Sequence, residues 1–224
     1  MKLNNKRTIL VGLAFLSICA FWQMYDSVVP LILTKTFHMN ETFSGAIMAA
    51  DNILALFLLP FFGSLSDRSH SKIGKRMPFI LFGTGCAVIL MNILPLLDNS
   101  YAAQPSGLKT ASFVIVLGLL LVAMGTYRSP AVALMPDVTP KPLRSRANAI
   151  INLMGAVGGI LYLITASVLY PNSKTAGLAH VNYRPLFIVV SVLMAASVAI
   201  LYFTTNEPKL AAAEKEYEAA HPEQ

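Results

Sequence analysis

The chain has 224 residues, of which 55% are hydrophobic and 12% are charged, and its formal net charge is +6. This composition, with a mean hydropathy of +0.61, excludes an ordinary soluble globular domain. The excess of Lys and Arg does not indicate nucleic-acid binding, because basic residues of membrane proteins gather on the cytosolic side.

Six apolar runs of about 20 residues follow one another, each long enough to cross the ~30 Å hydrocarbon core of a bilayer. They predict an all-α membrane protein whose bundle occupies residues 1–205, with spans over residues 8–34, 43–62, 78–97, 111–134, 145–170 and 183–205. The remaining residues, 206–224, are charged and Ala-rich, and we expect a cytosolic, partly helical linker there. Cys19 and Cys86 fall inside apolar runs and therefore indicate no disulfide.

Basic residues mark one side of the predicted bundle. They are concentrated in the N-terminal segment, in the second-to-third and fourth-to-fifth connections and in the tail. The cytosolic side of a membrane protein carries this excess, so both termini are predicted to be cytosolic. We expect a multi-pass protein of the plasma (inner) membrane, in contact with the lipid bilayer and without a metal or other cofactor.

The connection between the second and third spans, residues 63–79, is the most basic segment of the chain. Gly63 and Gly74 lack a Cβ atom and therefore permit tight turns and close helix approach. Asp67 and Arg68 lie at a helix boundary, where an acid can accept hydrogen bonds from exposed backbone N–H groups and a cation can pair across an interface. A merely solvated loop would explain the cations but not the two glycines.

This connection also carries a family resemblance. Residues 63–76 follow the pattern G-x-x-x-D-R-x-x-x-x-x-G-K-R, which resembles the loop between the second and third helices of the major facilitator superfamily. Residues 66–79 resemble more closely the glycoside–pentoside–hexuronide:cation symporters and the related sucrose-transporter-like proteins. Residues 130–148 resemble the end of the fourth helix and the following cytosolic loop of the same branch. Residues 21–23 resemble part of its first helix, although less closely.

The resemblance implies a fold and a gate. The fold would be the N-terminal six-helix bundle of a twelve-helix transporter, built from two three-helix inverted repeats. The gate would lie on the cytosolic side and bind the other half of the transporter when that side is shut. Its residues would be Gly63, Asp67, Arg68, Gly74, Lys75, Arg76, Asp137 and Arg144.

Three charged residues lie at bilayer depth, away from the ends of the predicted spans: Asp26, Asp51 and Arg128. A charge at bilayer depth costs about 2.5–3.5 kcal/mol even on insertion scales, so such residues normally face a cavity or a partner. Asp26 and Asp51 lie at matching depth on neighbouring helices, and Trp22 and Gln23 share a helix face with Asp26. An aromatic ring, an amide and a carboxylate on one helix face predict a sugar-binding surface.

Structural roles compete with these assignments. Trp22 could simply pack against a neighbouring helix, and either aspartate could be paired for structural reasons. Arg128 could pair with an acid of another helix, or extend toward the cytosol and Asp137.

The fifth span carries a stripe of polar and small residues. Asn148 and Asn152 lie one helical turn apart, and Gly155 and Gly159 extend the stripe. Small residues let helices approach closely, so we expect the glycines to pack, whereas Asn152 is a candidate for the substrate cavity.

The sequence departs from the resembled branch at the cation site. Melibiose-type members carry acids beside the proline matching Pro60, where this chain has Ala55 and Leu59, and another acid where it has Arg128. The resemblance therefore implies that the usual sodium site is lost. A membrane Arg near carboxylates suits proton coupling better, because a cation favours the charged form of an aspartate until its pairing changes.

These observations favour a secondary transporter, with sugar:proton symport as the leading hypothesis and this chain as its N-terminal half. A transporter of another solute or an exporter is an alternative, as is a non-transporting half. Alternating access needs two bundles, so a C-terminal six-helix half, covalent or separate, is the expected partner. An enzyme is not expected, since the sequence lacks a His-Glu-x-x-His motif and a paired Ser/His arrangement.

Overall fold

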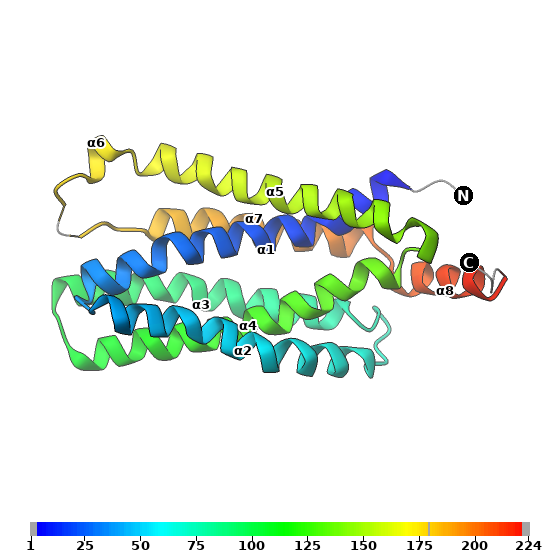
Figure 1. The fold of residues 1–224 in the computed structure, drawn as a ribbon, viewed down its shortest axis with the longest axis horizontal. Coiled ribbons are helices and arrows are strands. Elements are labelled where there is room, and N and C mark those ends of the chain that lie inside the picture. The colour runs from blue at the N-terminus through cyan, green and yellow to red at the C-terminus, as the bar shows by residue number, and fades with distance from the viewer. Residues whose placement is uncertain (1–3, 179, 221–224) are drawn as a thin grey trace.

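The computed structural model describes residues 4–178 and 180–220, and it is helical throughout with short connections (Figure 1). Six of its helices are long and apolar enough to cross a membrane, as predicted. They are α1 (Asn5–Leu31, continued by the π-helical turn η1, Ile32–Thr36), α2 (Glu41–Asp67), α3 (Met77–Ala103), α4 (Gly107–Asp137), α5 (Arg144–Leu169) and α7 (Arg184–Thr204). The short elements are η2 (Lys141–Leu143), α6 (Asn172–Thr175) and α8 (Glu207–Ala220).

Several helices extend beyond the predicted spans. The α2 helix continues to Asp67, and α3 continues to Ala103. The apolar pattern stops where polar residues begin, whereas backbone hydrogen bonding does not depend on hydropathy. As a result Asp98, which the sequence places in a connection, lies within α3. The last four residues of the predicted linker, 221–224, lie outside the described residues.

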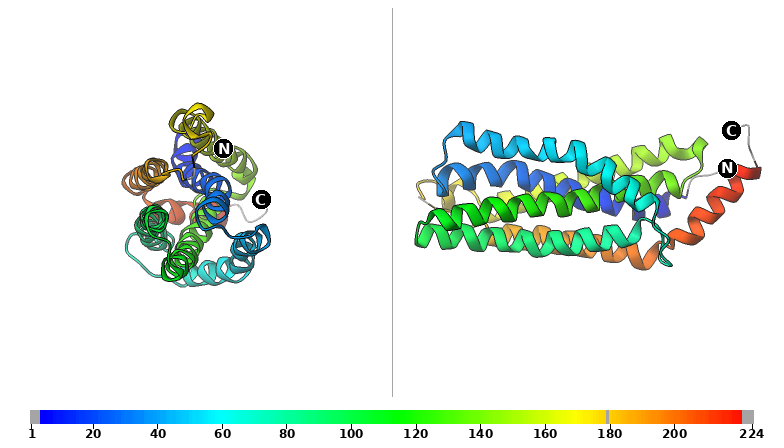
Figure 2. Two further views of the ribbon diagram at one scale, coloured as in Figure 1. Left: turned by 90° about the vertical axis from the view of Figure 1, so that its left-hand side faces the viewer. Right: turned by 90° about the horizontal axis from the view of Figure 1, so that it is seen from below.

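The six long helices lie side by side in one bundle, seen end-on in Figure 2. The α1 helix packs against α5 and α7, α3 packs against α4 and α7, and α2 packs against α4. Large side chains of α1, α3, α4 and α7 fill the core, among them Phe21, Tyr25, Met91, Tyr127 and Phe187.

The two ends of the bundle differ. One end, called the α8 end, holds α8 with the α2–α3 and α4–α5 connections (Figure 1). The opposite end, called the α6 end, holds α6 with the α1–α2 and α3–α4 connections. The predicted gate residues all belong to elements of the α8 end.

The closest helix contact joins α1 and α5 through glycine. A Cβ atom on Gly158 would lie 2.0 Å from the Leu16 carbonyl oxygen, and one on Gly155 would lie 2.8 Å from the Cys19 Sγ. A Cβ on Gly159 would meet no atom closer than the Gln23 Oε1, at 3.9 Å. The expectation of close packing is therefore confirmed for Gly155 and was wrong for Gly159, which lies about one-quarter turn away from the contact. The tightest of these contacts is made by Gly158, which the sequence analysis did not single out.

The α2 helix leaves most of its surface uncovered. In its most apolar 18-residue window no residue is buried, whereas 61% of the corresponding window of α1 is buried. Large side chains, including Ile53, Leu56, Phe57 and Phe61, stand exposed on it. This surface is available to lipid or to another protein.

Candidate functional site

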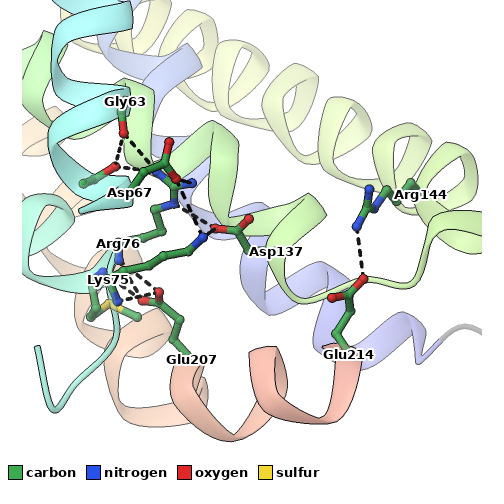
Figure 3. Close-up of polar contacts among 10 residues, drawn as sticks. Gly63, Asp67, Lys75, Arg76, Asp137, Arg144, Glu207 and Glu214 are labelled. Atoms are coloured by element: carbon green, nitrogen blue, oxygen red, sulfur yellow. Dashed lines mark hydrogen bonds and ion pairs between the residues drawn. The ribbon is translucent and has the colours of Figure 1, made fainter. Parts of the chain in front are cut away.

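A charge network centred on Arg76 joins three helices at the α8 end (Figure 3). The Arg76 side chain is buried and donates hydrogen bonds to Asp67 of α2 and to Asp137 of α4, the latter at 2.8 Å from Nε to Oδ2. It also donates to the Ser66 hydroxyl and, at 3.3 Å, to the Gly63 carbonyl. One guanidinium therefore binds two acids and the last turn of α2.

Lys75 adds a second cation to the same acids. Its Nζ lies 3.1 Å from the Asp137 Oδ2 and 3.7 Å from the Asp67 Oδ1. Gly63 lies close to α4, because a Cβ there would be 3.1 Å from the Ser129 Oγ. Five predicted gate residues, Gly63, Asp67, Lys75, Arg76 and Asp137, thus form one cluster.

Glu207, which the sequence analysis missed, caps the N-terminus of α3. Its carboxylate accepts hydrogen bonds from the backbone N–H groups of Lys75, Arg76 and Met77, at 2.8, 2.9 and 2.9 Å. Exposed N–H groups and the helix dipole make this position favourable for an anion. The side chain of Glu207 is buried, so α8 is docked on the α2–α3 connection rather than extended as a free linker.

Gly74 is required by this cap. Its φ of +115° lies in a region that L side chains rarely adopt. A Cβ on Gly74 would also lie 2.2 Å from the Glu207 Oε2. The glycine of the predicted motif therefore allows the carboxylate to reach the backbone of the next three residues.

We expect Glu207→Gln to lower the free energy of unfolding by about 2 kcal/mol, because the amide has one acceptor oxygen for three backbone donors and carries no charge. For a chain of this size the melting temperature would fall by about 4–8 °C. Thermal unfolding in detergent measures this. Glu216→Gln, an exposed position on the same helix, is the matched control, and an equal shift in both variants would contradict the capping role.

The other two predicted gate residues lie outside the cluster. Arg144 binds α8, with its Nη2 3.0 Å from the Glu214 Oε1 (Figure 3). The same nitrogen lies 3.4 Å from the Glu218 Oε1. Burial raises the pKa of the Glu214 carboxyl, the neighbouring Glu218 raises it further, and the Arg144 guanidinium opposes the rise. Arg68 is exposed at the C-cap of α2, and within the described part of the chain no ion pair of its side chain is found.

A second cluster lies inside the membrane-spanning part. Trp22 of α1, Asp51 of α2 and Arg128 of α4 line one small hollow together with apolar side chains of α2 and α4, and its volume is about 20 Å³. The Arg128 guanidinium carbon lies 5.5 Å from the Trp22 ring centroid, which is a cation–π distance. Three of the predicted binding residues therefore come together, and Arg128 turns toward Trp22 rather than toward Asp137.

The remaining candidates do not line this hollow. Asp26 is exposed on α1, and its carboxylate is near enough to Asp51 for their charges to interact. Gln23 is half-buried beside the α1–α5 contact, and Asn152 is exposed on α5. Ala55 and Leu59, the positions where the resembled branch has acids, line the hollow as apolar residues.

Two unpaired donors belong to the same region. The Trp22 Nε1 and the Tyr25 hydroxyl are buried and have no hydrogen-bond partner. The two rings pack edge to face at 5.3 Å between centroids. Tyr25 was not singled out from the sequence, because a tyrosine in an apolar helix is usually a core residue. Among the described residues, no group of three or more His, Cys, Asp or Glu side chains could hold a metal ion.

Comparison with known proteins identifies the class of molecule. The model of the Major Facilitator Superfamily matches residues 11–222. The chain belongs to this superfamily, and it is an integral, multi-pass membrane protein. No solved structure gives a significant match.

The relatives that the chain resembles include sucrose transport proteins. It is 36% identical to sucrose transport protein SUC3 of Arabidopsis thaliana over 57% of this chain and 23% of that protein. It is 30% identical to sucrose transport protein SUT3 of Oryza sativa subsp. indica over 84% of this chain and 42% of that protein. Solute carrier family 45 member 3 of Macaca fascicularis is 25% identical over 83% of the chain. The chain thus spans less than half the length of these relatives.

Proposed function

We propose that the chain is the N-terminal half of a sugar:proton symporter that works by alternating access. The observation that carries the proposal is the hollow lined by Trp22, Asp51 and Arg128. An indole ring can stack on the C–H face of a sugar, while a carboxylate and a guanidinium bind its hydroxyl groups. The names of the relatives, which are sucrose transport proteins, support a sugar as substrate.

The hollow is only part of a binding site. Its volume of about 20 Å³ is far below the ~300–1,000 Å³ typical of small-molecule pockets, so a sugar needs further space beside it. Asp26 and Asn152 stand exposed on membrane-spanning helices, where contact with lipid would be costly. A second six-helix half, covalent or separate, would cover these residues and the uncovered side of α2 and complete the cavity.

The residues in and near the hollow favour the proton as the coupling ion. Asp51 and Asp26 are carboxylates that can take up a proton, and their charges interact with each other. Protonation of Asp51 would change the charge that the hollow presents to Arg128 and to the sugar. The apolar Ala55 and Leu59 offer no oxygen ligands to a sodium ion in the same hollow.

The Arg76 network would act as a gate on the cytosolic side. It joins the ends of α2, α3 and α4, while the exposed Arg68 is available to pair with the second half. In this orientation both termini are cytosolic, in agreement with the distribution of basic residues. The plasma membrane is the proposed location.

Transport by the complete carrier, this chain with its second half, tests the proposal in proteoliposomes. We expect a pH gradient to drive labelled sucrose uptake, and sucrose addition to raise the external pH. Arg128→Gln should reduce uptake about tenfold or more, since it removes charge-assisted hydrogen bonds. Arg146→Gln, which alters an exposed arginine at the start of α5, should leave uptake unchanged.

Asp51→Asn separates proton coupling from sugar binding. If Asp51 carries the proton, the variant loses uptake driven by the pH gradient but still exchanges labelled for unlabelled sucrose. If the variant loses sucrose exchange as well as gradient-driven uptake, Asp51 takes part in sugar binding. Unchanged gradient-driven uptake in both Asp51→Asn and Arg128→Gln, or uptake driven by sodium alone, contradicts the proposal.

A further inference from the structure

Asp98 is a fully buried carboxylate near the α6 end of the bundle. Its exposed fraction is 0%, and neither of its oxygens has a hydrogen-bond partner. An ionised carboxylate in such a place is costly unless a neighbouring charge compensates it. Neither the substrate hollow nor the Arg76 network contains Asp98, so those sites give no reason for a buried acid here.

The nearest basic group is His180, from the connection between α6 and α7. Its Nε2 lies 3.9 Å from the Asp98 Oδ2 and 2.8 Å from the Asn99 Oδ1. The Asn99 amide nitrogen donates to the Asn182 Oδ1 at 2.9 Å, which orients the Asn99 oxygen toward the imidazole. The His180 Nε2 must therefore be the donor in its contact with Asn99.

The second ring nitrogen of His180 determines its charge. The Nδ1 lies 3.3 Å from the Thr36 hydroxyl, which can donate to a neutral imidazole or accept from a charged one. The site therefore accommodates both protonation states of His180 without a lost hydrogen bond. With a neutral His180, the charge of a deprotonated Asp98 has no compensating partner.

We propose that Asp98 and His180 together bind one proton at the α6 end of the bundle. The proton resides on the imidazole as an ion pair or on the carboxyl as a neutral acid, and either state removes the uncompensated charge. It thereby fastens the connection between α6 and α7 to α3 and η1. This site is separate from the residues proposed for sugar transport.

None of the other charged and titratable groups described around Asp98 can take the place of His180 as the group that compensates its charge. From α4, the Lys109 Nζ donates to the carbonyls of Ser100 and Gln104. Lys35 of η1 and Arg184 of α7 are exposed. Tyr183, which precedes α7, interacts electrostatically with Asp98 but is an acid itself, so its ionisation would only add negative charge.

A proton fits the site better than a metal cation. A sodium ion would need several oxygen ligands besides the Asp98 carboxylate. The nearest candidates, the Asn99 amide oxygen and the Thr36 hydroxyl, are both engaged by the imidazole of His180. Sodium binding is therefore an outcome that the test must exclude.

The pH dependence of thermal unfolding tests the proposal on the full chain in detergent. In the unfolded chain the aspartate releases its proton above about pH 3.9 and the histidine above about pH 6.5. The folded pair retains one proton to higher pH, so the stability it contributes is complete below pH 6.5 and is lost as the pH rises. We expect the melting temperature of the wild type to fall by about 3 °C or more between pH 6 and pH 8.5.

Asp98→Asn should flatten this dependence and match or exceed the wild-type melting temperature at pH 8.5, because the buried charge is gone. His180→Gln should lower the melting temperature but keep its fall with pH, because the buried Asp98 carboxyl must then hold the proton alone. His70→Gln, an exposed histidine at the α8 end, is the control and should follow the wild type. Hydrogen exchange of residues 180–183 should be slower at pH 6 than at pH 8.5 only in the wild type and the control.

Equal pH dependence in the wild type, Asp98→Asn and His180→Gln would overturn the proposal. So would a melting temperature that rises with sodium, relative to choline, in the wild type but not in Asp98→Asn. If Asp98 had only a structural role, Asp98→Asn would have a lower melting temperature than the wild type at every pH. That result would also contradict a shared proton.

Discussion

Replacing Arg76 with alanine is expected to lower the free energy of unfolding by about 3 kcal/mol, the lower limit for breaking a buried ion pair. The arginine is only 4% exposed, and its removal leaves Asp137 and the end of α2 without their main donor. The estimate is at the lower limit because the Asp67 side chain is 55% exposed and regains water. Thermal unfolding in detergent should show a melting temperature lower by about 6–12 °C.

The control for this prediction lies in the same connection. Arg68→Ala removes the same side chain from an exposed position and should shift the melting temperature very little. Arg76→Lys should be intermediate, since an ammonium retains the charge but not the planar donors that bind two acids at once. Equal losses for Arg68→Ala and Arg76→Ala would show that Arg76 is not the centre of the network.

Gly158→Ala is expected to have a comparable effect through a different cause. The new Cβ would lie 2.0 Å from the Leu16 carbonyl oxygen, which belongs to the backbone of α1 and cannot turn aside as a side chain can. The two helices must separate, and overpacking of this kind costs about 3 kcal/mol. The same thermal measurement should again show a fall of about 6–12 °C.

Gly85→Ala is the matched control for Gly158→Ala. Gly85 is also in the interior of a membrane-spanning helix, but a Cβ there would meet nothing within 4 Å. Alanine has the higher helix propensity, so the control should be neutral or slightly stabilising, by up to about 1 kcal/mol. A loss of stability in Gly85→Ala equal to that in Gly158→Ala would mean that the loss does not come from the α1–α5 contact.

The sequence supports good predictions where the signal is local. Apolar length predicts all six membrane-crossing helices, because hydropathy over about 20 residues is a direct measure of the ability to cross a bilayer. Charges within apolar runs draw attention to Asp51 and Arg128, and a shared helix face adds Trp22. These three residues line one hollow in the structure.

The sequence gives less information where a contact joins distant segments. Glu207 lies about 130 residues after the backbone groups that it caps, and in a charged, Ala-rich segment it resembles any solvated glutamate. Asp98 was assigned to a connection because the apolar run ends one residue before it. Gly158 and Gly159 are equivalent as residue types, and only the rotation of α5 against α1 distinguishes them.

The Glu207 cap has a practical consequence for work with this protein. A version shortened to end at Thr204, or a reporter domain inserted directly after that residue, would remove or displace a carboxylate on which the start of α3 depends. Loss of activity after such an edit would then reflect a frayed third helix rather than a missing tail. Fluorescent or affinity tags should therefore be attached beyond Ala220, where the last described helix has ended.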